Sequence, residues 1–123
     1  KETFETRVRQ FAGFLAEPLL GPTAIDAIMA QNDWDASIAL AAIRLLGKRP
    51  NVDVSVVGYD DWWDTEERQW EPTRPLATVN KNNALIGREM INLLLERHAG
   101  KLPPEPQCRL LSPKLTLVPQ VES

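Results

Sequence analysis

The sequence predicts an α/β fold in which a mostly parallel sheet is flanked by helices. Apolar residues recur at helical spacing in three stretches, short β-branched or apolar runs lie between them, and glycine or proline stands at most junctions. Strands separated by helices need right-handed crossovers, which make neighbouring strands parallel. A chain of 123 residues forms one domain at most.

The first predicted elements are a helix over residues 5–17 and a strand over residues 23–30. The helix is amphipathic, and proline and glycine follow it at Pro18 and Gly21. The strand is an apolar run broken only by Asp26, which is typical of a buried parallel strand. The apolar residues on one face of the helix are Val8, Phe11, Phe14 and Leu15.

A second helix and a second strand follow in the same order. Residues 34–46 are rich in alanine and leucine and stop at Gly47, a residue favoured just after helices. Asn32 and Asp33 are both good helix caps, and we expect Asp33 to be the cap. Residues 52–57 carry four valines and predict the second strand.

The rest of the chain starts with a long loop rich in aromatic and acidic residues. Loops of such length in compact domains are often functional. A strong helix follows before Gly100, then a proline-rich linker. The predicted segments are a loop over 59–75, a strand over 76–79, a helix over 83–99, and extended segments over 108–111 and 115–118.

Composition excludes several classes of function. Fourteen basic and 17 acidic residues give a net charge of −3, which argues against DNA binding by this segment itself. No apolar run is long enough to span a membrane. Cys108 is the single cysteine and His98 the single histidine, so we expect no intrachain disulfide, metal site or cofactor. The chain begins at Lys1 rather than a methionine, which suggests a fragment or a processed chain.

Two polar residues are expected to meet at one edge of the sheet. Ligands of open parallel sheets bind at the carboxyl ends of the strands. Asn32 follows the first predicted strand and Asp60 follows the second. A carboxylate accepts hydrogen bonds from hydroxyl groups, and an amide both donates and accepts them. The alternative is that both residues only cap turns, and the pattern alone leaves these two interpretations equal.

Several segments together resemble a known family. The run Val-Ser-Val-Val-Gly-Tyr-Asp-Asp at 54–61 resembles the signature of the lac repressor (LacI/GalR) family of bacterial transcription regulators. Pro-Leu-Ala-Thr-Val at 75–79 and the Asn-Asp pair at 32–33 are similar to other segments of that family, at matching spacing. Lys81 stands where that family commonly has glutamine, and the loop before Pro75 is longer than usual.

The resemblance implies a two-lobed, periplasmic-binding-protein-like fold that binds an effector between its lobes. We expect residues 1–123 to be a single partial domain, the C-terminal lobe, with the DNA-binding head and the N-terminal lobe absent. The implied function is sensing a sugar-like effector in a cytoplasmic, homodimeric repressor or related regulator. The alternative is the same lobe of a periplasmic sugar-binding protein of a transporter. No nucleophile–base pair is evident, so we do not expect an enzyme.

The resemblance favours Asn32 and Asp60 as effector-binding residues. Lys81 could reach a polar effector, although a lone lysine on a loop is more often simply solvated. Trp62 could stack on a sugar ring, or could equally pack at a subunit interface.

A dimer surface is expected along helix 34–46 and the tryptophan-rich loop. The helix carries apolar residues all round, more than an apolar stripe facing a sheet requires. The rival explanation is that other segments of the same subunit cover it. The residues expected to contact a partner copy are Trp34, Ile38, Ile43 and Trp70.

Overall fold

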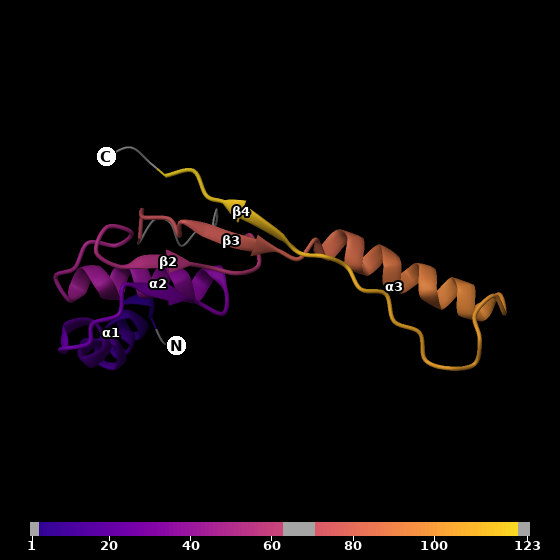
Figure 1. Ribbon diagram of the computed structural model, residues 1–123, viewed down its shortest axis with the longest axis horizontal. Coiled ribbons are helices and arrows are strands. Elements are labelled where there is room, and N and C mark those ends of the chain that lie inside the picture. Colours follow the sequence, from indigo (N-terminus) through magenta and orange to yellow (C-terminus); the bar gives the residue numbers. More distant parts are fainter. Residues whose placement is uncertain (1–2, 63–70, 121–123) are drawn as a thin grey trace.

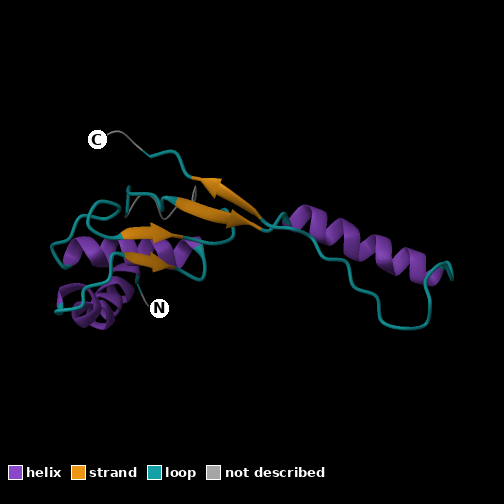
Figure 2. Ribbon diagram, viewed as in Figure 1, coloured by secondary structure: helices purple, strands orange, loops and turns teal. Residues whose placement is uncertain are grey.

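The computed structural model describes residues 3–62 and 71–120, in which four strands form one sheet (Figure 1). The order across the sheet is β1-β2-β3-β4, where β1, β2 and β3 are parallel and β4 is antiparallel to β3 (Figure 2). Ile28 pairs with Val56, and Val57 pairs with Ala77. The mostly parallel sheet is therefore confirmed. The strands are β1 (Ala27–Met29), β2 (Ser55–Val57), β3 (Ala77–Asn80) and β4 (Lys114–Leu117).

Two helices, α1 (Phe4–Leu20) and α2 (Asp33–Leu45), build the core together with β2. Apolar residues of all three elements are withdrawn from water, and α2 contributes most of them. Burying a leucine or isoleucine side chain stabilises a fold by about 1.5–3 kcal/mol, so this cluster is the main source of stability. The largest fully buried apolar side chains are Leu19, Leu40, Ile43, Val54 and Val56.

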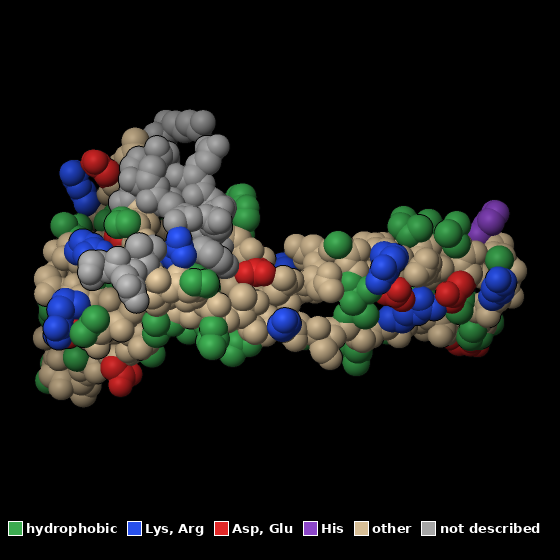
Figure 3. All heavy atoms as spheres, turned by 90° about the horizontal axis from the view of Figure 1, so that it is seen from above, with side chains coloured by type: hydrophobic (Ala, Val, Ile, Leu, Met, Phe, Trp, Pro, Cys, Tyr) green, Lys and Arg blue, Asp and Glu red, His purple; other side chains and the backbone are tan. Residues whose placement is uncertain are grey.

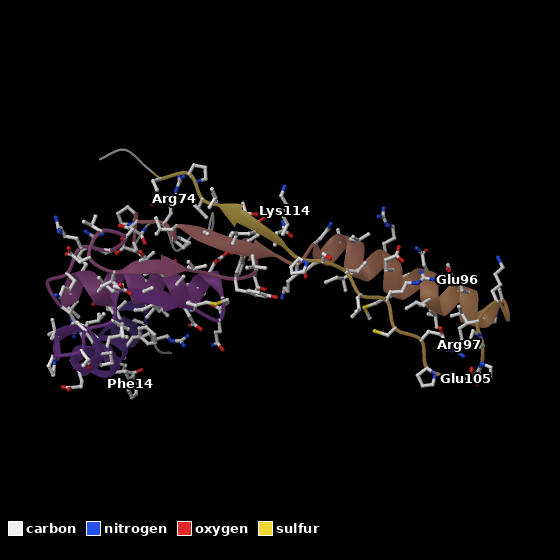
Figure 4. All side chains as sticks on the ribbon, viewed as in Figure 1. Phe14, Arg74, Glu96, Arg97, Glu105 and Lys114 are labelled. Carbon is white, nitrogen blue, oxygen red and sulfur yellow. The ribbon has the colours of Figure 1, made fainter. Side chains whose placement is uncertain are left out.

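The third helix, α3 (Asn83–His98), extends away from the other helices and has no buried residue (Figure 1). The segment after it returns alongside the helix. Arg109 binds Glu89 at 2.9 Å and Glu96 at 2.6 Å, and Arg97 donates to the carbonyl oxygens of Pro103 and Glu105 (Figure 4). We call α3 and the segment that follows it, residues 83–113, the arm. Acidic, basic and apolar side chains all lie on its surface (Figure 3).

The first predicted helix, the first two predicted strands and the predicted extended segment 108–111 differ from the structure. The first helix does not stop before Pro18 but continues to Leu20, and the Gly21 N–H closes it on the Glu17 carbonyl at 2.9 Å. The first two strands are each three residues long, shorter than the apolar runs that predicted them. Residues 108–111 form no strand, because they run beside α3, where no strand offers backbone partners.

Within the described residues, no helix is long and apolar enough to cross a membrane. The same part of the chain contains no group of three or more His, Cys, Asp or Glu side chains arranged to hold a metal ion.

Candidate functional site

The carboxyl ends of β1, β2 and β3 bring three polar segments to one edge of the sheet. Asn32 follows β1, the turn of residues 58–62 follows β2, and Lys81 follows β3. Parallel pairing of neighbouring strands produces this convergence. Of the residues predicted from the sequence, Asp60 and Lys81 are brought into direct contact here.

Asp60 and Lys81 form an ion pair at this edge. The Lys81 Nζ lies 2.5 Å from the Asp60 Oδ1, and the two side chains are each about one-third exposed. The Nζ also lies 5.4 Å from the centroid of the Tyr59 ring. The adjacent Asp60 carboxylate raises the pKa of Lys81, so the ammonium group stays charged at neutral pH. The pair therefore presents an anionic acceptor and a cationic donor side by side, a combination that suits neighbouring hydroxyl groups.

Asn32 is used in capping α2. Its Oδ1 accepts from the Asp35 N–H at 2.7 Å, and its Nδ2 donates to the Asp35 Oδ2 at 3.1 Å. The expectation that Asp33 is the cap is therefore wrong, because Asn32 has the extended backbone of a cap while Asp33 is already helical. Gln31 also donates to the Asp35 carboxylate, at 2.7 Å. The structure thus shows the capping role of Asn32.

Asp33 is the residue of this region that sequence reasoning missed. Its side chain is only 2% exposed. The carboxylate accepts from the Thr78 hydroxyl at 2.8 and 3.0 Å and from the Trp62 N–H at 2.5 Å. Burial raises the pKa of Asp33, and the hydrogen bonds from Thr78 and Trp62 oppose that shift. The sequence signal available was the pair of adjacent cap residues, because only one of Asn32 and Asp33 can cap the helix and the other needs a different partner.

The turn after β2 has an unusual backbone. Asp60 and Asp61 are consecutive residues in the left-handed region, with φ of 97° and 56°. The Asp60 N–H donates to the Val79 carbonyl at 2.9 Å, and the Asn80 side chain donates to the Asp61 carboxylate at 2.6 Å. The turn is therefore attached to β3 through both backbone and side-chain groups. The Trp62 side chain is 64% exposed.

The expected dimer residues are placed differently from the prediction. Ile38 and Ile43 are 2% and 0% exposed within the single chain, because α1 covers the side of α2 that seemed to be in excess. They are core residues, and the prediction that they contact a partner is wrong. Trp34 is half-buried and meets Phe4 edge to face at a centroid distance of 5.9 Å. Trp70 lies outside the described residues.

Comparisons with known proteins agree with this architecture. A profile of the periplasmic binding protein-like domain matches residues 2–119. The HTH-type transcriptional regulator CelR of Thermobifida fusca is 42% identical over 77 residues, which are 63% of this chain and 22% of that protein.

Two solved structures extend the similarity over most of the chain. One, described as a transcriptional regulator CelR–cellobiose complex, has a TM-score of 0.69 and 35% identity, covering 94% of this chain and 32% of that one. The other, a LacI family transcriptional regulator from Arthrobacter sp. FB24 in complex with lactose, has a TM-score of 0.69 and 28% identity, covering 95% and 41%. The present chain thus spans less than half the length of each of these relatives. It belongs to the periplasmic binding protein-like domain family, and within it to the effector-binding domains of the LacI/GalR family.

Proposed function

We propose that the chain is the C-terminal lobe of the effector-sensing domain of a DNA-binding transcription regulator. The Asp60–Lys81 pair at the carboxyl edge of the sheet is the observation that carries this proposal. A sugar-like effector places vicinal hydroxyl groups on the pair, one donating to the carboxylate and one accepting from the ammonium. Trp62, on the same turn as Asp60, supplies an exposed aromatic side chain, and Asn32 contributes if its amide exchanges Asp35 for a hydroxyl.

Two features support a second lobe in the functional protein. No residue of α3 is buried, although the helix carries several large apolar side chains. The relatives are also much longer than this chain. In the proposed protein the effector lies between the two lobes, and its binding alters the affinity for operator DNA. The exposed apolar residues of α3 are Met90, Ile91, Leu94 and Leu95.

The DNA contact in this proposal comes from a separate N-terminal head. The chain has a net charge of −3, which suits an effector lobe better than a DNA-binding surface. The regulator acts in the cytoplasm as a homodimer, the state that suits a two-fold symmetric operator. Trp34 and Trp70 remain the proposed contributors to the dimer surface.

The test is titration calorimetry of the full-length protein with cellobiose and with lactose, the sugars present in the two similar complexes. Asp60→Ala removes a charged hydrogen-bond acceptor, which is worth about 1.5–3 kcal/mol, so the affinity for the bound sugar should fall at least about tenfold. Lys81→Met should weaken binding in the same direction.

The matched control is Asp53→Ala, which removes a carboxylate that is also paired with a basic side chain, at 2.5 Å from Arg49, but lies before β2 rather than after it. This variant should bind the sugar like the wild type. Unchanged affinity in Asp60→Ala would contradict the assignment of the site. Operator affinity that does not respond to a bound sugar would contradict the regulatory function.

A further inference from the structure

The buried carboxylate of Asp33 lies beneath the turn that carries Asp60. Asp33 belongs to the first turn of α2, whereas the groups that bind it come from the end of the 58–62 turn and from β3. One side chain therefore joins a helix to two segments that are 29 and 45 residues away in the sequence. An ionised carboxylate only accepts hydrogen bonds, so it can receive both the Trp62 N–H and the Thr78 hydroxyl.

The hydroxyl of Thr78 connects Asp33 to a second backbone group, the N–H of Asp61. Thr78 is 0% exposed, and its single hydroxyl proton is directed to the Asp33 carboxylate. A lone pair of the same oxygen then accepts the Asp61 N–H at 3.1 Å. Asp33 thus holds the Trp62 amide directly and orients the acceptor for the Asp61 amide.

These hydrogen bonds hold the backbone of Asp60 and Asp61, both of which have positive φ. Consecutive non-glycine residues with positive φ are sparsely populated and persist only where neighbouring groups fix them. The Asp61 N–H donates to the Thr78 hydroxyl, and the Trp62 N–H donates to the Asp33 carboxylate. The Asp60 N–H donates to the Val79 carbonyl. The direction of the Asp60 side chain follows from this backbone.

Gly58 provides the space that the carboxylate occupies. A Cβ atom at this position would lie 1.9 Å from the Asp33 Oδ1 and 3.4 Å from the Cβ of Ala36. Gly58 still donates its N–H to the Ala77 carbonyl at 2.9 Å, so the end of β2 stays in register over the carboxylate. Glycine at 58 and aspartate at 33 therefore form one packing unit beneath the turn.

We propose that Asp33 is a positioning residue of the effector site, which holds the 58–62 turn through Thr78 and the Trp62 amide and thereby places Asp60 beside Lys81. The proposal rests on the proposed function for the role of Asp60 as an effector acceptor. Asp33 itself, at 2% exposure, does not touch the effector.

The experiment measures amide hydrogen exchange and sugar affinity in the full-length protein carrying Asp33→Asn. An asparagine presents an NH₂ group where one of the two donors now binds, so the Asp61 and Trp62 amides should exchange at least about tenfold faster. Amides within β2 should exchange faster only by the factor that any change in the global free energy of unfolding accounts for. The affinity for cellobiose or lactose should fall about tenfold, as for loss of one charged hydrogen bond.

A second pair of variants keeps the test independent of whether Asp33→Asn folds. Thr78→Val removes the hydroxyl at almost unchanged volume and should release the Asp61 amide in the same way. Thr78→Ser retains the hydroxyl and should restore slow exchange and sugar affinity. Asp53→Asn is the control, because its carboxylate also accepts a backbone N–H, from Arg49 at 2.7 Å, but lies before β2, whereas the turn follows β2.

A double-mutant cycle separates positioning from a purely structural role. If Asp33 acts through Asp60, Asp33→Asn should lower sugar affinity no further, within about twofold, in an Asp60→Asn background. Its effect on melting temperature should remain in both backgrounds. A lowered melting temperature with unchanged Asp61 and Trp62 exchange would overturn the proposal, and so would additive losses of affinity.

The proposed function can fail separately. Unchanged sugar affinity in Asp60→Asn would remove Asp60 as an effector residue, and with it the role of Asp33 in binding. If neither sugar binds the wild type, the exchange rates of the two amides decide whether Asp33 holds the turn, and unchanged rates overturn it.

Discussion

Helices α2 and α3 have similar local signals and opposite environments. Each begins with an asparagine cap: Asn32 accepts from the Asp35 N–H at 2.7 Å, and Asn82 accepts from the Leu85 N–H at 3.2 Å. The last turn of α2 carries one basic residue and that of α3 carries two, and a positive charge there interacts favourably with the helix dipole. Yet seven residues of α2 are buried and none of α3 is. Helix formation and helix burial are therefore separate properties of this chain.

The two helices are also held by different forces. α2 is surrounded by α1 and β2, so apolar burial stabilises it. α3 is held mainly by polar contacts with the segment that returns beside it. Arg109 of that segment pairs with Glu89 and Glu96 of α3. Arg97 of α3 donates to carbonyl oxygens of the same segment. Exposed pairs of this kind are worth about 0.2–1 kcal/mol each. Loss of apolar volume should therefore lower the free energy of unfolding strongly in α2 and only weakly in α3.

The largest expected effect is a matched pair of leucine truncations. Leu40 is 0% exposed and Leu94 is 63% exposed. Leu40→Ala should lower the free energy of unfolding by about 2–5 kcal/mol, because a cavity is left in the core. Leu94→Ala in the 123-residue chain should change it by about 0.5 kcal/mol or less. Urea denaturation measures both, and equal losses would show that α3 is covered in solution.

Two glycines should respond in opposite directions to alanine. Gly58→Ala places a methyl group against the Asp33 carboxylate and should lower the free energy of unfolding by about 1–3 kcal/mol. Gly87 lies within α3 with nothing within 4 Å of an added Cβ, so Gly87→Ala should raise it by about 0.5–1 kcal/mol. Thermal melts of the two variants give the comparison, and a stabilised Gly58→Ala protein would contradict the close packing described for Asp33.

Two arginines allow the same comparison for ion pairs. Arg44 donates to Glu71 at 3.1 Å, and Glu71 is 3% exposed. Arg44→Met leaves that carboxylate buried with fewer donors, a loss of about 1–2 kcal/mol. Arg109→Met in the arm removes two partly exposed ion pairs and should lower the free energy of unfolding by less than about 1 kcal/mol. Denaturant midpoints would reveal a larger loss at Arg109 if the returning segment were essential to the fold.

The smallest expected effect is a pH dependence at Asp53. Its hydrogen bonds to Arg49 lower the pKa of the carboxyl from 3.8 to about 2. A depressed pKa in the folded state stabilises the protein above the unfolded pKa, and this contribution disappears as the pH falls from about 4 to about 2. Asp53→Asn should therefore be slightly less stable than wild type at pH 6 and equal to it near pH 2.

Asp33 should have the opposite pH dependence. Burial raises the pKa of Asp33, so its titration lowers stability as the pH rises above 3.8. Denaturation at a series of pH values should show the difference between wild type and Asp33→Asn changing in the direction opposite to that for Asp53→Asn. The same direction for both variants would contradict the burial of Asp33.

The sequence by itself determined the order of most helices and strands and the edge of the sheet at which polar segments meet. Helical periodicity, caps and apolar runs act over a few residues, and parallel order follows from alternation. These local patterns were enough to expect Asn32 and Asp60 at one edge, whereas the contact of Lys81 with Asp60 came only from the tertiary structure. They could not show that Asn32 rather than Asp33 caps α2, because both residue types are good caps and only the backbone conformation at each position distinguishes them.

Only the tertiary structure decided which surfaces are covered. The apolar residues of α2 suggested an interface, but α1 packs against them, so Ile38 and Ile43 belong to the core. Residues 108–111 have a strand-like sequence but no neighbouring strand. The Asp33 carboxylate meets Thr78, 45 residues away, only because β3 pairs beside β2. Coverage, pairing and buried hydrogen bonds each depend on a partner distant in sequence, which no local pattern encodes.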